Sequence, residues 1–146
     1  MYTLKTEQSF DSAHFLAGYE GKCRNIHGHR WRVEIEIQAE ALKPQGTQRG
    51  MLVDFGDLKA HLKELSDHLD HALIIETGTL REKTMEALAE EGFRVLSYDF
   101  RPTAENFAKY FYDEMTLRGY DVRRAVVYET PNNCAAYMGG EAHEDV

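Results

Sequence analysis

The residues with the most evident chemistry lie at positions 23–29, which read Cys-Arg-Asn-Ile-His-Gly-His. Residues 30–37 follow directly and alternate polar and apolar side chains, which is the period of a half-buried β-strand. If this strand begins early enough to include His27 and His29, both imidazoles lie on one face, roughly 6.6 Å apart along the strand. Two imidazoles at that spacing can bind one metal ion.

A third histidine strengthens the metal interpretation. His14 lies upstream at the end of the segment Phe-Asp-Ser-Ala-His, in mostly small or apolar surroundings. A bare His-x-His pair is typical of two solvated histidines as much as of ligands. Three histidines with one open position, however, are the ligand set of a catalytic zinc site, whereas a closed set of four is typical of a structural one. We therefore predict a catalytic metal bound by His14, His27 and His29.

Cys23, four residues before His27, has two interpretations. It is either a fourth zinc ligand or a base or nucleophile beside the metal. The pKa of a free thiol is near ~8.5, and a metal or a cationic neighbour such as Arg24 would lower it. The spacing alone does not decide between these roles. The second cysteine, Cys134, is predicted to be a small buried hydrophobe.

Three acidic positions are further candidates. Asp70-His71 follows an apolar helical pattern. Because adjacent residues do not face each other on a helix, the two can act together only at its end or with another residue between them. Glu129 ends an apolar strand, where it is either solvated or able to accept two donors of a heterocycle. Glu105 falls in the first turn of a predicted helix and is a helix-dipole partner or a second acid that anchors a ligand.

Composition restricts the class of protein. The 146 residues are predicted to form one domain, 1–146, and the net charge of −8 argues against nucleic acid and anionic membranes as partners. No apolar run approaches the about 20 residues that cross a bilayer. Two cysteines give no disulfide framework, and the first residues do not resemble a secretory signal. We therefore expect a cytoplasmic location.

The hydrophobic pattern predicts an α+β fold. A loop over residues 11–28 is expected to carry His14, Cys23 and His27, and the acidic residues 141–146 are expected to fray. Four strands are predicted to form an antiparallel sheet, with helices inserted between strands 2 and 3 and packed on one face, and its open edges invite pairing between subunits. The predicted strands are 2–10, 29–40, 122–129 and 134–138, and the helices begin at the N-caps Asp54 and Thr103, with a weaker helix over 80–91 and a short strand over 93–98.

Six motifs in this order resemble the 6-pyruvoyl-tetrahydropterin synthase / 6-carboxytetrahydropterin synthase family over nearly the whole chain. They are Phe10-Asp11-Ser12-Ala13-His14, Cys23-x-x-x-His27-Gly28-His29, Val53-Asp54-Phe55-Gly56-Asp57-Leu58-Lys59, Leu69-Asp70-His71, Pro102-Thr103-Ala104-Glu105-Asn106 and Tyr128-Glu129-Thr130.

The resemblance implies a tunnelling fold, in which trimers close a twelve-stranded β-barrel and two trimers stack into a hexamer. It implies that His14, His27 and His29 hold Zn²⁺ and that Cys23 is the general base. It also implies that Asp70-His71 relays protons across a subunit boundary and that Glu129 anchors a pterin.

The short spacing between Cys23 and His27 resembles the bacterial carboxy-synthase branch of queuosine biosynthesis. That branch implies a zinc-dependent lyase, 6-carboxy-5,6,7,8-tetrahydropterin synthase, which converts 7,8-dihydroneopterin triphosphate to 6-carboxytetrahydropterin, acetaldehyde and triphosphate. The alternatives are a 6-pyruvoyl-tetrahydropterin synthase, a zinc-dependent hydrolase of a small substrate, and a structural zinc module in which Cys23 is a ligand. Residues 72–76 and an acidic insertion at 76–98 depart from the family pattern.

Overall fold

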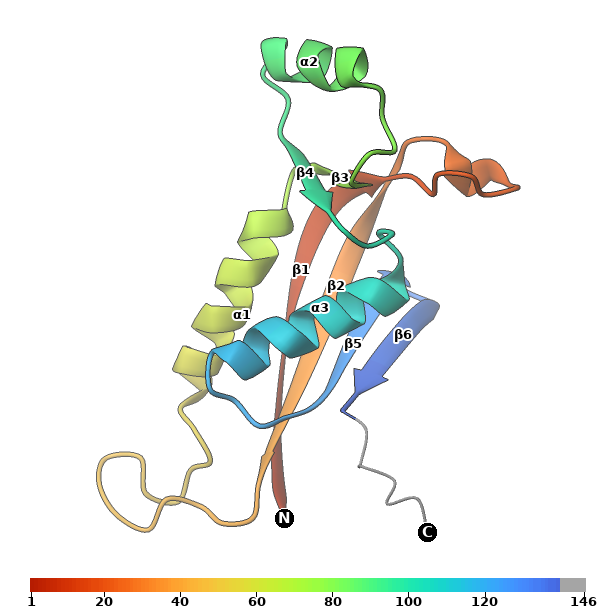
Figure 1. Cartoon of the computed structure of the whole chain (residues 1–146). Helices are drawn as coiled ribbons and strands as arrows, with labels where there is room; N and C mark the ends of the chain where they lie inside the picture. Colours follow the sequence, from red (N-terminus) through yellow and green to blue (C-terminus); the bar gives the residue numbers. More distant parts are fainter. Residues whose placement is uncertain (140–146) are drawn as a thin grey trace, which may run out of the picture.

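The computed structural model describes residues 1–139 of the chain, so the acidic stretch 141–146 lies outside the described residues. Strands and helices follow one another along the chain in a mixed order (Figure 1). The elements are β1 (Tyr2–His14), the short 3-10 helix η1 (Lys22–Arg24), β2 (His27–Ala39), α1 (Phe55–Leu69), β3 (Leu73–Glu76), α2 (Glu82–Glu90), β4 (Val95–Tyr98), α3 (Ala104–Leu117), β5 (Val122–Thr130) and β6 (Asn133–Met138).

The described strands form one six-stranded mixed sheet in the order β4-β3-β1-β2-β5-β6. The α+β class is confirmed, but the prediction of a four-stranded, wholly antiparallel sheet is wrong. The four expected strands form the antiparallel part, and β3 and β4 extend the sheet as parallel strands. β3 pairs with β1 only at Ala13 and His14.

β1 and β2 are longer than predicted, so the expected loop over residues 11–28 is wrong at both ends. β1 continues to His14 and β2 begins at His27, because the antiparallel ladder runs on through residues of low strand preference. In that ladder His14 lies opposite His27, and Ser12 lies opposite His29. The three histidines therefore lie together at one end of the hairpin.

The hydrophobic core lies between the sheet and helices α1 and α3, which cover the same face (Figure 1). Trp31, Val33 and Ile35 of β2 are completely buried in it. The predicted helical stripes are confirmed apart from Phe55, which is 56% exposed. The buried helical residues are Leu58, Leu62, Leu65 and Leu69 of α1 and Phe107, Ala108, Phe111 and Met115 of α3.

Both predicted N-caps are confirmed. The Asp54 carboxylate accepts a hydrogen bond from the Gly56 N–H at 2.6 Å, and the Thr103 hydroxyl accepts one from the Asn106 N–H at 3.2 Å. The Thr103 cap fixes where α3 begins, next to the histidines.

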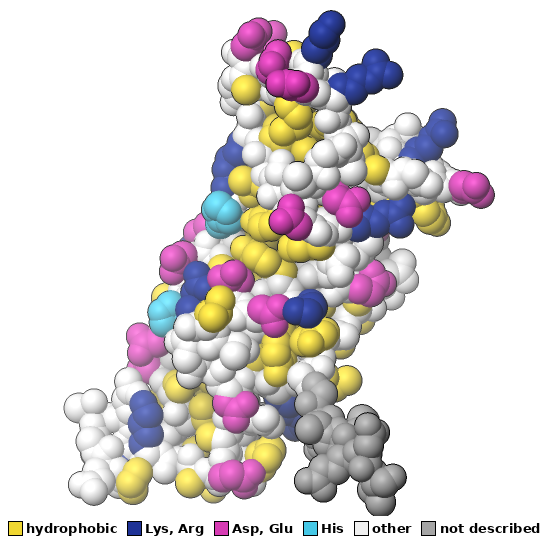
Figure 2. Space-filling model, in the orientation of Figure 1, with side chains coloured by type: hydrophobic (Ala, Val, Ile, Leu, Met, Phe, Trp, Pro, Cys, Tyr) yellow, Lys and Arg dark blue, Asp and Glu magenta, His cyan; other side chains and the backbone are white. Residues whose placement is uncertain are grey.

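The insertion at 76–98 begins at the last residue of β3 and contains α2 and β4. No residue of α2 is buried, and this helix projects from the end of the molecule (Figure 1). Figure 2 shows acidic and basic side chains together at this projecting end. Within residues 1–139, no helix has the length and apolar character required to cross a bilayer.

Candidate metal centre and substrate pocket

The structure brings the three predicted ligands together. The ring centroids of His14, His27 and His29 are 4.5, 5.1 and 4.9 Å apart pairwise. One potential ligand atom from each imidazole and one carboxylate oxygen of Glu129 all lie within 4.8 Å of one another. This group of four is compact enough to hold one metal ion.

Backbone carbonyls fix the tautomers of two imidazoles. Nδ1 of His14 lies 2.7 Å from the carbonyl oxygen of Pro102, and Nδ1 of His27 lies 2.7 Å from that of Asn25. Because a carbonyl oxygen only accepts, each Nδ1 carries the proton and donates it. Each Nε2 is then left with a lone pair, and these two nitrogens face each other at 3.0 Å. Two lone pairs at that distance need a cation between them, as in metal sites where the outer ring nitrogen is hydrogen-bonded.

The inner ring nitrogen of the third histidine, His29, also lacks a hydrogen-bond partner within the described residues. Nε2 of His29 is buried and has no hydrogen bond within the described chain. Oε1 of Glu129 lies 3.2 Å from this nitrogen, but the angle between the two groups is not that of a hydrogen bond. A buried, unpartnered nitrogen is rare in proteins, and a metal ion would satisfy it. The donor set and its geometry therefore fit a metal.

Burial favours the neutral form of the His14 and His29 imidazoles. The pKa of His14 is lowered to about 4, chiefly by desolvation; the Pro102 carbonyl opposes this shift, and the nearby His27 and His29 add to it. Desolvation also lowers the pKa of His29, although the Glu129 carboxylate acts in the opposite direction. Trp31 supplies part of this burial, since its ring stands edge-on to His14 at 5.0 Å. Neutral imidazole is the form that binds metals.

Cys23 lies outside the metal-capable group. It is half-buried in η1 and lines a pocket of about 340 Å³ that also includes Glu105, Glu129 and Cys134. Within the described residues, the fourth potential ligand beside the three histidines is therefore Glu129 and not Cys23. Cys134 is exposed on β6, so its predicted burial is wrong.

The two acids predicted to bind substrate meet in the Cys23 pocket. Glu105 lies in the first turn of α3, next to the Thr103 cap, and Glu129 lies near the end of β5. The Glu129 side chain is 30% exposed and reaches from the histidine cluster into this pocket. The arrangement can hold a polar ring between an acid and a thiol, next to a metal.

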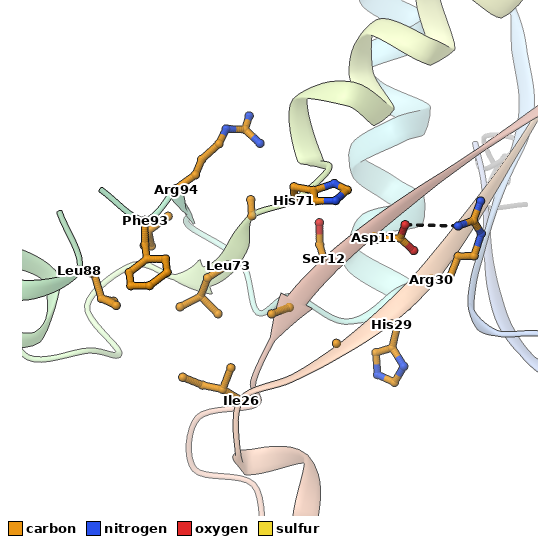
Figure 3. Close-up of a pocket in the computed structure, with 14 residues that line it drawn as sticks. Asp11, Ser12, Ile26, His29, Arg30, His71, Leu73, Leu88, Phe93 and Arg94 are labelled. Carbon is orange, nitrogen blue, oxygen red and sulfur yellow. Dashed lines mark hydrogen bonds and ion pairs between the residues drawn. The ribbon is translucent and has the colours of Figure 1, made fainter. Parts of the chain in front are cut away.

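Asp70 and His71 form a hydrogen-bonded pair at the end of α1. Oδ2 of Asp70 and Nδ1 of His71 are 2.8 Å apart. The Asp11 N–H donates to Oδ1 of Asp70, and this bond is the largest cause of the lowered pKa of Asp70. The two side chains thus meet at a helix end, one of the two arrangements that the sequence leaves open. His71 lines a larger groove of about 730 Å³, shared with Gly28 and His29 (Figure 3), and the Cys23 pocket is separate from it.

Several residues that hold the site in place could not be identified from the sequence. Asn25 and Pro102 act through backbone carbonyls, which every residue possesses. Arg94 donates to the carbonyls of His68 and Asp70, far away in sequence. Asp11 lies inside a recognised motif, but it too contacts Asp70 and His71 only through its backbone N–H and carbonyl.

Comparisons with known proteins find similarity over nearly the whole chain. The model of the 6-pyruvoyl tetrahydropterin synthase family matches residues 3–140. A 6-carboxy-5,6,7,8-tetrahydropterin synthase of Haemophilus influenzae is 32% identical over 144 residues, which cover 94% of this chain and 99% of that protein. One from Synechocystis sp. is 37% identical over 121 residues, covering 76% of this chain and 94% of that protein.

Solved structures share the fold. An uncharacterized protein from Wolinella succinogenes has a TM-score of 0.80 at 20% identity, covering 95% of this chain and 98% of that chain. The 6-pyruvoyl tetrahydropterin synthase of Caenorhabditis elegans has a TM-score of 0.65 at 23% identity, covering 95% of this chain and 96% of that chain.

Proposed function

This chain belongs to the 6-pyruvoyl tetrahydropterin synthase family, and on that basis we propose that it is a zinc-dependent 6-carboxy-5,6,7,8-tetrahydropterin synthase of queuosine biosynthesis. The proposed reaction converts 7,8-dihydroneopterin triphosphate and one water molecule to 6-carboxytetrahydropterin, acetaldehyde and triphosphate. Relatives that bear this name and align with most of the chain support the carboxy product. With a net charge of −8, a cytoplasmic small-molecule enzyme without nucleic-acid or membrane partners is proposed.

The observation that carries the proposal is the convergence of three imidazoles whose Nε2 atoms have no hydrogen-bond donor to pair with. His14, His27 and His29 would hold the Zn²⁺, since imidazole nitrogen is a preferred zinc ligand. Bound there, zinc supplies Lewis-acid polarisation of substrate oxygens.

The pocket beside the histidines would bind the pterin. Glu129 accepts two N–H donors of the heterocycle through its carboxylate, and Glu105 is the second acid that orients the ring. Both acids line the same pocket as Cys23, so a pterin bound by them would share this pocket with the thiol.

Cys23 would act as the general base that takes a proton from the substrate side chain. Its position outside the metal-capable group leaves the sulfur free for this role. The Asp70–His71 pair would relay protons. Because His71 lines a groove separate from the Cys23 pocket, we propose that the pair serves the pocket of a neighbouring subunit in a trimer or a dimer of trimers.

One further candidate is a 6-pyruvoyl tetrahydropterin synthase, favoured by the matching family model and by neighbours in fold. It would use the same groups and retain the side chain that the carboxy enzyme cleaves. A structural zinc module would need Cys23 as a ligand, and the position of Glu129 beside the histidines counts against it.

Product analysis tests the proposal. The zinc-loaded protein is incubated with 7,8-dihydroneopterin triphosphate, and products are identified by mass spectrometry and an acetaldehyde assay. We expect acetaldehyde and 6-carboxytetrahydropterin in equal amounts. A pyruvoyl product without acetaldehyde would establish the second candidate, and full zinc content without substrate consumption would favour the structural module.

A further inference from the structure

The C-terminal end of α1 is held by an arginine from the insertion. The last carbonyls of a helix have no partner within it. Arg94 supplies one, because Nη1 donates to the Asp70 carbonyl at 2.7 Å and Nη2 donates to the His68 carbonyl. A guanidinium fork suits this task, since it presents several donors in a fixed plane.

The residue after this helix end has an unusual backbone. His71 has φ = 53°, and it is the one non-glycine residue with positive φ in the described chain. This left-handed conformation is costly for a residue with a side chain and persists only where the surroundings enforce it. Its N–H donates to the Asp11 carbonyl at 2.7 Å, while Asp70 accepts from the Asp11 N–H. The sharp turn at His71 lets two adjacent side chains meet at 2.8 Å.

Arg94 is itself fixed by the sheet. Its carbonyl accepts from the Leu73 N–H at 3.0 Å, and the next residue, Val95, is paired with Leu73 where β3 and β4 begin. The backbone of the insertion is therefore tied to the strand that follows His71, and the Arg94 side chain reaches back to the helix before it. Figure 3 shows Arg94 and His71 on neighbouring walls of the large groove.

We propose that Arg94 is a positioning residue, which holds the end of α1 so that His71 stays in its left-handed conformation and in contact with Asp70. This gives the insertion at 76–98 a function: it delivers Arg94 to the proton-relay pair. The effect on turnover rests on the proposed function, whereas the effect on backbone geometry does not.

The proposal is tested with four variants of the full-length, zinc-loaded protein. They are Arg94→Ala, Arg94→Lys, His71→Ala and the double variant Arg94→Ala/His71→Ala. Arg81→Ala is the matched control, because Arg81 is an exposed arginine of the same insertion that has no ion pair or side-chain hydrogen bond within residues 1–139. Zinc content and thermal midpoint are recorded for each variant.

Misplacing a reacting group by about 1 Å can cost on the order of 100-fold in rate. We expect Arg94→Ala to lower kcat by roughly 10- to 100-fold with KM changed less than about threefold, and Arg94→Lys to recover part of the loss. The double variant should be no slower than His71→Ala alone, because both changes disable the same unit. Losses that multiply in the double variant, or an unchanged kcat in Arg94→Ala, would overturn the proposal.

Amide hydrogen exchange gives a readout independent of activity. In Arg94→Ala the His71 amide should exchange faster than in the wild type, whereas Arg81→Ala should leave its rate unchanged. Unchanged protection of His71 in Arg94→Ala would contradict the positioning role even if the wild type acts on another substrate. A wild type that does not consume the pterin triphosphate, with the exchange result as expected, would contradict the proposed function alone.

Discussion

At the scale of single residues, the burial of His14 makes the stability of the protein depend on pH. Its pKa is about 4 in the folded protein against an ordinary value of 6.5, because burial disfavours the imidazolium. The unfolded chain therefore binds more protons between these two values, so the stability of the metal-free protein falls as pH drops from about 6.5 to 4. A difference of this size corresponds to at most about 3 kcal/mol, and His29 acts in the same direction.

Urea unfolding of the metal-free protein at several pH values measures this effect. His14→Asn should flatten the dependence between pH 6.5 and 4. His68→Gln, a change at an exposed histidine of α1, should leave it intact. Stability that is independent of pH in the wild type would show that His14 is not held as described.

The Cys23→Ala variant distinguishes a general-base role of Cys23 from a role as a zinc ligand. None of the atoms in the metal-capable group is removed, so zinc content should stay at one per chain. Turnover should fall by about 10²–10⁴-fold, the usual contribution of a general base. Metal analysis and single-turnover rates test both parts, with Cys134→Ala as the matched thiol of the same pocket, for which a far smaller loss is expected. Loss of zinc from Cys23→Ala would make Cys23 a ligand.

Glu129→Gln distinguishes two roles of one carboxylate. Oε1 lies 3.2 Å from Nε2 of His29, yet the side chain also lines the Cys23 pocket. As a pterin anchor it should raise KM while zinc content is unchanged, because the amide replaces one of two acceptors by a donor. Zinc titration and steady-state kinetics distinguish the pterin anchor from the metal ligand. A variant that fails to retain zinc would show that Glu129 is a metal ligand.

At the scale of elements, regular patterns were predictable and non-local pairings were not. The stripe of α3 and the Asp54 and Thr103 caps followed from local spacing. β3 was missed because its three consecutive apolar residues, without alternation, fit a strand or a buried helix equally well. Its partners, the end of β1 and β4, are parallel strands that no local turn announces.

The same distinction holds for the site. His27 and His29 were predictable as neighbours because strand geometry places alternate residues on one face. The position of His14 opposite His27 depends on the β1–β2 register, which the expected loop over 11–28 did not include. The contact of Glu129 with His29 depends on β5 pairing with β2, which sequence spacing does not encode. The exposure of Cys134 likewise reflects its place on the edge strand β6.

Helix α3 supports the metal centre through one aromatic contact. Phe107 is completely buried, and its ring stands edge-on to Trp31 at 5.0 Å, while Trp31 in turn packs against His14. Phe107→Ala should lower the free energy of unfolding by about 3–5 kcal/mol through the cavity it leaves. Phe93→Ala is the control, because Phe93 is 64% exposed. Denaturant unfolding compares them, and equal stability of both variants would contradict this packing.

At the scale of the whole molecule, the sheet has unpaired edges. β6 forms one edge, and within residues 1–139 no strand pairs with the outer side of β1 between Tyr2 and Ser12. Exposed edges are templates for pairing with another chain. We predict that the protein sediments as a trimer or a hexamer, through pairing of these two edges into the proposed barrel. A stable, fully active monomer at micromolar concentration would refute this assembly.

The pairing of His14 with His27 also has a consequence for the order of folding events. These ligands are 13 residues apart, whereas His14 and its acceptor Pro102 are 88 apart. Closing the short loop costs little chain entropy, so a β1–β2 hairpin can bring the imidazoles together before α3 arrives. A metal ion present during refolding would then capture this hairpin early and fix its register, and the distant carbonyl would lock the finished centre afterwards.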